Sequence, residues 1–188
     1  MSETEIRDAK LIQYLNEAYG KEKELETALE AHITMALRDT YKKRLKDHLK
    51  ETKAHARQLD RRIKKLGGKA DAGPLPEAVL EVAQAAQTAT KKAAALAQGP
   101  MHAARGLSPA EKQLKNAKTE YSEEHEEIAN YTAIETFAEA VGDKETAKLA
   151  RDIRRDEERM AKFLAGQITV MSKQVAREEV PAAQRKTR

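Results

Sequence analysis

A glutamate interrupts an apolar helical stripe near the N-terminus. From Lys10 to Leu37 the apolar residues recur at alternating spacings of four and three, which is typical of a helix face buried against other helices. The position that continues this series between Ala18 and Leu25 is Glu22. A buried carboxylate is costly unless it is paired with a cation, protonated or bound to a metal. Glu22 is therefore a candidate metal ligand or a member of a buried ion pair.

The C-terminal half of the chain repeats this pattern. Glu157 takes the position between Ile153 and Met160 in the apolar stripe of the last predicted helix. Glu124 and Glu127 both fall on the inner face of the helix before it. Residues three apart share one face of a helix, so these two carboxylates are expected to face the same interior.

Histidines supply a second kind of donor. His48 and His55 lie at the edge of the buried face of the second predicted helix, and Glu51 lies on the flank between them. Imidazole nitrogens are ligands for iron, zinc and other transition metals. Together with the carboxylates they make a mixed nitrogen and oxygen donor set.

These donors are predicted to converge on one layer. Counted from the expected turns between helices, Glu22 lies level with His55, and Glu127 lies level with Glu157. Carboxylate oxygens with imidazole nitrogens suit iron or manganese, and bridging carboxylates can hold two such ions. The alternative is a buried layer of ion pairs and hydrogen bonds without a metal. Because acids from several helices meet at matching heights, we favour the metal.

Four long helices must position these residues. The chain is rich in Ala, Leu, Glu, Lys and Arg, with no Trp and two Phe, which indicates an all-α protein. Periodicity and helix start and stop signals predict core helices over residues 5–37, 41–66, 108–141 and 144–175. The sequence from Ser108 to Glu111 supplies an N-cap, a proline at the first helical position and a capping-box glutamate. Short turns make each pair of helices an antiparallel hairpin.

A long crossover joins the two hairpins. Residues 67–109 contain two Gly- and Pro-rich breaks around an Ala-rich stretch from Pro76 to about Ala97, which we expect to form a short extra helix. One long crossover is the topology of a ferritin-like four-helix bundle. We predict a single ferritin-like domain over residues 1–175 and a polar, basic, disordered tail over residues 176–188.

Composition excludes several functions. The 188 residues include no Cys, so the chain has no disulfide framework, thiolate metal site or cysteine nucleophile. No stretch approaches the roughly 20 apolar residues of a membrane span, and the N-terminus has no apolar signal segment. We therefore expect a cytoplasmic protein without membrane contact. No Ser/His/Asp arrangement or phosphate-binding Gly motif supports a hydrolase.

Charge is distributed unevenly along the chain. The net charge is +4, but residues 38–69 contain thirteen Lys or Arg against four Asp or Glu, whereas residues 110–164 contain ten against fourteen. A basic helix can attract nucleic acid or another acidic partner. No aromatic residues are interleaved with these charges, and a solvated surface is the simpler interpretation. A non-catalytic interaction module that uses this helix is the alternative to a metal-binding protein.

Three stretches of the sequence resemble one family. KLIQYLNEAYGKEKELETAL, HLKETKAHARQLDRRIKKLGG and EEHEEIANYTAIETFAEAVGDKETAKLARDIRRDEERMAKFL are similar to the YciE/YciF-like family of ferritin-like bacterial proteins associated with stress responses. The similarity covers about residues 10–168 apart from the crossover, and the piece from Glu124 to Tyr131 is its most specific part. The resemblance implies a ferritin-like bundle, a homodimer and a di-metal centre of iron or manganese. The ligands that it implies are Glu22, Glu51, His55, Glu124 or Glu127 or both, and Glu157.

The donor pattern departs from the general ferritin-like one. That pattern takes one Glu from each of two helices and Glu-x-x-His from each of the other two. Glu51 is followed at this spacing by Ala54, with His55 one residue later, and Glu157 is followed by Met160. The coordination sphere must be rich in carboxylates, use a flanking histidine, or be incomplete. We expect a stress-related redox or metal-handling role, with oxidase or peroxide-consuming activity as the enzymatic candidates.

Two further predictions concern residues around the layer. Tyr131 lies one helical turn from the acids of its helix, so we expect it to hydrogen-bond a buried glutamate. We expect His32, His102 and His125 on the surface or in the crossover.

Overall fold

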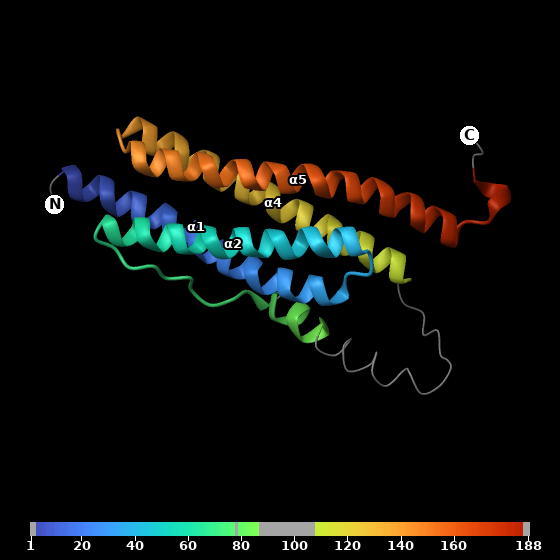
Figure 1. The fold of residues 1–188 in the computed structure, drawn as a ribbon. Coiled ribbons are helices and arrows are strands. Elements are labelled where there is room, and N and C mark those ends of the chain that lie inside the picture. Colours follow the sequence, from blue (N-terminus) through green and yellow to red (C-terminus); the bar gives the residue numbers. More distant parts are fainter. Residues whose placement is uncertain (1–2, 78, 87–107, 186–188) are drawn as a thin grey trace.

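Four long helices lie side by side in the computed structural model, which describes residues 3–77, 79–86 and 108–185 (Figure 1). They are α1 (Glu3–Met35), α2 (Asp39–Lys65), α4 (Pro109–Ala140) and α5 (Lys144–Glu179), followed by a single 3-10 turn, Ala182–Gln184. The described residues contain no strand, so the all-α prediction is confirmed. None of these helices is long and apolar enough to cross a membrane.

The predicted helix boundaries hold to within two residues, with one exception. α5 continues to Glu179, four residues beyond the predicted end at Val175, so residues 176–179 of the predicted tail are helical. Both hairpins have short turns, as predicted. Gly142 in the second turn has a φ of +77°, a conformation that other residues rarely adopt.

Both helices of the second hairpin, α4 and α5, have an N-terminal side-chain cap. Ser108 accepts a hydrogen bond from the backbone N–H of Glu111, and Pro109 occupies the first turn of α4, as predicted. Asp143 caps α5 by accepting a hydrogen bond from the backbone N–H of Thr146 at 3.0 Å. The Arg62 guanidinium of α2 also donates to Asp143, at 2.5 Å. This cap therefore ties the first hairpin to the second.

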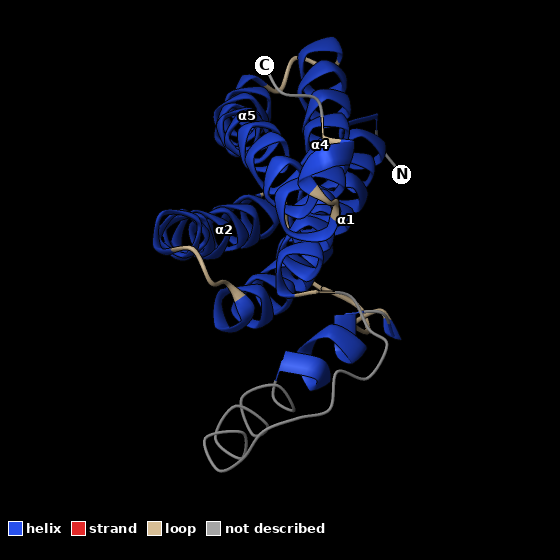
Figure 2. Ribbon diagram, turned by 90° about the vertical axis from the view of Figure 1, so that its right-hand side faces the viewer, coloured by secondary structure: helices blue, strands red, loops and turns tan. Residues whose placement is uncertain are grey.

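The four helices pack as a ring of neighbours. α1 contacts α2 and α4, and α5 contacts α4 and α2, as the view from the end of the bundle shows (Figure 2). The apolar interior is divided into two main clusters. One is nearer the turn between α1 and α2 and includes Leu25, Leu29, Leu45, Met160 and Leu164. The other includes Leu15, Leu59, Ile63, Ile134 and Ile153.

The crossover runs along the outside of α1 (Figure 1). The Asn16 side chain fastens it by donating to the carbonyl of Lys69 and accepting from the backbone N–H of Asp71. Residues 77 and 79–86 are helical, and Val79 is buried, whereas Leu75 is exposed. The rest of the predicted extra helix lies outside the described residues.

The Asp143 cap yields a stability prediction. Burial alone would raise the pKa of Asp143, but hydrogen bonds from Thr146 and Arg62 hold the pKa below its usual 3.8. Asp143→Ala removes the cap and leaves Arg62 without this partner, so we expect a loss of about 2–3 kcal/mol at pH 7 in urea unfolding. A depressed pKa stabilises the fold above the unfolded-state value, so this difference shrinks as the pH falls below about 4. Asp152→Ala on the exposed face of α5 is the control, and an equal loss in both variants would contradict the role of the cap.

Candidate metal centre

Six buried donors form a layer between the two apolar clusters. Each of the six is at most 2% exposed. α1 and α5 give one carboxylate each, α2 gives two imidazoles and α4 gives two carboxylates. We call this set the carboxylate–histidine layer, and its members are Glu22, His48, His55, Glu124, Glu127 and Glu157.

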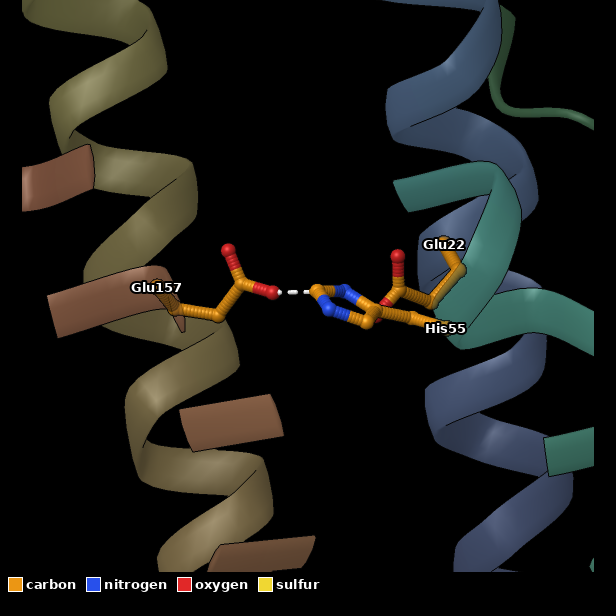
Figure 3. A group of neighbouring side chains, drawn as sticks. All are labelled: Glu22, His55 and Glu157. Atoms are coloured by element: carbon orange, nitrogen blue, oxygen red, sulfur yellow. Dashed lines mark ion pairs between the residues drawn. The ribbon is translucent and has the colours of Figure 1, made fainter. Parts of the chain in front are cut away.

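Three of these side chains meet around His55 (Figure 3). Its Nδ1 lies 2.9 Å from Oε1 of Glu157 and 3.4 Å from Oε1 of Glu22. One donor atom from each of the three lies within 4.8 Å of the other two. Helices α1, α2 and α5 therefore bring two carboxylates and one imidazole to one point, and the predicted equal heights of Glu22 and His55 are observed.

A second group of three forms around His48. Its Nε2 lies 2.9 Å from Oε1 of Glu124 and 3.6 Å from Oε2 of Glu157. These donor atoms also lie within 4.8 Å of one another. Glu157 belongs to both groups, with one oxygen toward each histidine. It is therefore placed as a carboxylate shared between two neighbouring sites.

Glu127 is the sixth member of the layer. It is 1% exposed, and neither of its oxygens has a hydrogen-bond partner among the described residues. Burial raises its pKa well above 4.5, and the nearby charges of Glu22 and Glu157 raise it further. A buried carboxylate without a partner is the costly arrangement that a cation would relieve.

Other oxygens in the layer are equally unpartnered. Oε2 of Glu22, Oε2 of Glu124 and both oxygens of Glu157 accept no hydrogen bond from the described part of the chain. His55 Nδ1 makes a close ion pair with Glu157, yet it is not aligned for a hydrogen bond. The layer thus presents lone pairs that the protein itself leaves unused.

Each histidine also has a carboxylate behind it. His48 Nδ1 lies 3.2 Å from Oε2 of Glu51, and His55 Nε2 lies 3.0 Å from Oδ2 of Asp156. Each ring therefore has one nitrogen toward the layer and the other against an outer carboxylate. Histidines that bind metals are oriented in this way.

The structure does not bring Glu51 into the layer. Its side chain is 33% exposed and pairs with Arg44 as well as with His48. The pKa of Glu51 falls to about 2 because its hydrogen bonds to His48 and Arg44 outweigh the effect of burial. Glu51 was predicted as a ligand, but the structure places it outside the layer, as the outer partner of His48.

The two imidazoles offset part of the negative charge of the four carboxylates in the layer. Burial opposes their protonation, but the surrounding carboxylates prevail and raise the pKa of His48 to about 10 and that of His55 to about 11. Burial raises the pKa of Glu124 to about 8, whereas the two histidines lower that of Glu157. Since metals bind neutral imidazole, metal binding to this layer would release protons.

The donor inventory equals that of the ferritin-like pattern, but it is distributed differently. That pattern has four Glu and two His, with one His on each of two helices. Here both histidines come from α2, seven residues apart, and α2 supplies no carboxylate to the layer. Instead, α4 supplies two carboxylates. Read from His55, the Glu-x-x-His spacing begins at Thr52, which is fully buried. At the corresponding place on α5, Met160 packs in the apolar core.

A second buried polar cluster, made of His32, Tyr41 and Glu120, was not predicted from the sequence. His32 was predicted on the surface, but it is 4% exposed, and its Nδ1 lies 2.7 Å from Oε1 of Glu120. Tyr41 donates a hydrogen bond of 2.5 Å to the other oxygen of Glu120. The available signal was the position of Glu120 one turn before Glu124 on the inner face. His125 is exposed, as predicted, and His102 lies outside the described residues.

The predicted hydrogen bond from Tyr131 to a buried glutamate is confirmed. Its hydroxyl donates a hydrogen bond of 2.5 Å to Oε1 of Glu22, and its ring is fully buried in the apolar cluster beyond the layer. Burial and the adjacent glutamates raise the pKa of Tyr131 well above 10, so the phenol stays protonated and remains a donor. This bond fixes the orientation of the Glu22 carboxylate.

Comparison with known families places the chain. A family described as "Domain of unknown function (DUF892)" matches residues 7–177. The chain belongs to this family. No curated protein sequence matches it. The DUF892 match spans nearly all of the bundle and every residue of the layer, and together with the fold match to YciF it confirms the resemblance to YciE/YciF-like proteins.

Solved structures confirm the ferritin-like fold. A protein from Xanthomonas campestris superposes with a TM-score of 0.67 at 24% identity, covering 92% of this chain and 97% of that one. The E. coli stress protein YciF gives 0.64 at 18%, covering 89% and 97%. Desulfovibrio desulfuricans bacterioferritin, whose structure describes a diiron site, gives 0.65 at 18%, covering 92% and 86%. At these identities the likeness establishes the fold alone.

The unpartnered Glu127 gives a prediction for the metal-free protein. Its raised pKa means that folding above pH 4.5 must protonate the side chain or bury its charge, and this cost disappears at lower pH. We expect Glu127→Gln to raise the free energy of unfolding by about 1–2 kcal/mol at pH 7.5, with little effect at pH 4.5. Chelator-treated protein in urea unfolding provides the measurement.

The neighbouring residue offers the matched control. Glu126 is exposed and pairs with Lys21 at 2.9 Å, so Glu126→Gln should change stability little at either pH. A Glu127→Gln variant that is less stable than the parent at pH 7.5 would show that its carboxylate is satisfied in the metal-free fold.

Proposed function

We propose that the chain binds two ions of iron or manganese within the helical bundle and has a redox or metal-handling role. The observation that supports this best is the orientation of the two histidines. Each has one nitrogen toward the buried carboxylates and the other against an outer carboxylate, and Glu157 lies between them. A protonated imidazole between two carboxylates would have the same orientation, but a layer of such ion pairs would leave Glu127 without a cation, since neither of its oxygens has a hydrogen-bond partner among the described residues.

The donors present fit such a pair of ions. Hard carboxylate oxygens with imidazole nitrogens suit iron and manganese, and the absence of Cys removes softer thiolate ligands. Unpartnered lone pairs on Glu22, Glu124, Glu127 and Glu157 provide the free coordinating atoms. Four carboxylates balance four positive charges, so a pair of divalent ions would neutralise the layer.

The two groups of donors support a division of the ligands between two ions. Glu22 and His55 would hold one ion, His48 and Glu124 the other, and Glu157 would be shared by both. Glu127 is buried among the other carboxylates and could ligate either ion. When bound, iron or manganese supplies one-electron redox chemistry, which is suited to oxygen or peroxide as a substrate.

The remaining residues keep this centre fixed and dry. The apolar clusters on both sides exclude water, which strengthens electrostatic interactions inside the layer. Tyr131 holds the Glu22 carboxylate, and Glu51 and Asp156 hold the two imidazoles. A site held by packed helices is well ordered before its metal arrives.

Two relatives support the proposal from outside the chain. Desulfovibrio desulfuricans bacterioferritin is described with a diiron site, and E. coli YciF is described as a stress protein. We extend both properties to this chain as part of the proposal: a di-metal centre, used under stress. The homodimer that the resemblance implies stays a prediction.

The interaction-module alternative has less support. Many basic residues of α2 are neutralised within the chain, which weakens the case for an acidic partner or nucleic acid. Those with ion pairs are Arg44, Lys50, Lys53, Arg62, Lys64 and Lys65.

Metal stoichiometry tests the proposal. Protein loaded with iron or manganese and freed of excess metal should contain about two ions per chain by elemental analysis. Glu157→Gln removes the shared carboxylate, so we expect it to lose most of both ions. The adjacent Glu158 points away from the layer and pairs with Arg154, so Glu158→Gln should bind as the parent does. Equal metal content in the two variants would refute the assignment.

The outer carboxylates give a second prediction. Glu51→Gln and Asp156→Asn weaken the orientation of the imidazoles without removing a ligand, so we expect each to lower manganese affinity by about 10- to 100-fold while the fold is retained. Competition with a chromogenic chelator measures the change, with Asp152→Asn as the surface control. Affinities that match the control would mean that these contacts are surface ion pairs without a role in binding.

A further inference from the structure

Thr52 has a buried hydroxyl that the fold leaves unused. The residue is fully buried in α2, and its Oγ1 has no hydrogen-bond partner in the described part of the chain. Five other threonines in the helices donate to a backbone carbonyl three or four residues earlier. They are Thr27, Thr34, Thr119, Thr132 and Thr169. Thr52 does not make this hydrogen bond, although it is fully buried.

Thr52 lies next to the carboxylate–histidine layer. Thr52 lies four residues after His48 and three before His55, so all three share one face of α2. Both histidines belong to the carboxylate–histidine layer, which places Thr52 beside it. In the Glu-x-x-His spacing that ends at His55, Thr52 takes the place of the glutamate. A shorter side chain with a hydrogen-bonding tip replaces a carboxylate there.

We propose that the Thr52 hydroxyl positions a small exogenous ligand at the metal centre by donating a hydrogen bond to it. This inference rests on the proposed function. The ligand must be small, because Thr52, His48 and His55 are at most 2% exposed and apolar clusters enclose the layer. It must accept a hydrogen bond, as water, hydroxide or azide does. Thr52 is a positioning residue in this scheme and not a metal ligand.

The competing explanation is a structural hydroxyl. Rotation of the side chain could direct Oγ1 to the carbonyl of His48, four residues earlier, as the other threonines do. The hydroxyl would then be satisfied within the helix and indifferent to anything bound at the layer. The two explanations differ in the metal-free protein and in the loaded protein.

Thermal unfolding of the metal-free protein is the first measurement. An unsatisfied buried hydroxyl destabilises the fold, so Thr52→Val, which keeps the shape and removes the hydroxyl, should raise Tm by about 2–4 °C. Thr132→Val on the exposed face of α4 removes a back-bonded hydroxyl and is the control. A Thr52→Val variant with an unchanged or lower Tm would overturn the proposal.

Azide binding to the cobalt(II)-loaded protein is the second measurement. We expect Thr52→Val to retain two ions per chain and to bind azide about tenfold more weakly than the parent in visible titrations. Thr52→Ser keeps the hydroxyl and should restore the affinity. Equal azide affinity in the parent and in Thr52→Val, or no azide binding by loaded parent protein, would overturn the role of Thr52. If elemental analysis finds no cobalt, iron or manganese bound to the parent, the proposed function itself fails, which distinguishes that case from a failure of the role of Thr52.

Discussion

Four carboxylates buried in the middle of a helical bundle are the constraint on which the rest of the structure depends. Glu22, Glu124, Glu127 and Glu157 are all essentially inaccessible, and most of their oxygens accept no hydrogen bond from the described residues. Such an arrangement opposes folding, so it must be held by packing on both sides. Two apolar clusters flank the layer, and the Asp143 cap joins the hairpins at one end. The apolar clusters and this cap therefore stabilise a fold whose central layer is unfavourable without a cation.

The arrangement of donors shows how one fold can build the same donor set in different ways. Four helices around a common axis offer many inward positions at one height, and what matters for a metal is which atoms meet there. In this chain α2 supplies both imidazoles, and α4 supplies two carboxylates. The general ferritin-like pattern places its histidines on two helices instead. The total of four carboxylates and two imidazoles is the same, and only the helices that supply them differ.

Periodicity identified much of this from the sequence, and its failures have physical causes. Glu22 and Glu157 stand in apolar series, so the helical repeat alone places them inside. His55 and Glu51 lie near the edge of a buried face, where a small rotation of the helix decides which side chain turns inward, and only packing fixes that rotation. The Glu-x-x-His spacing was therefore counted from Glu51 and not from Thr52. His32 is buried because Glu120 meets it from a helix distant in sequence.

The location of bound metal is the most direct test of this account. Crystals of manganese-loaded protein, measured by anomalous diffraction at the manganese edge, would locate the ions without reference to activity. We expect two peaks inside the bundle, one against Glu22 and His55 and the other against His48 and Glu124, with Glu157 touching both. Peaks confined to surface carboxylates, with none in the layer, would contradict this expectation and leave the buried acids as a polar layer without a metal.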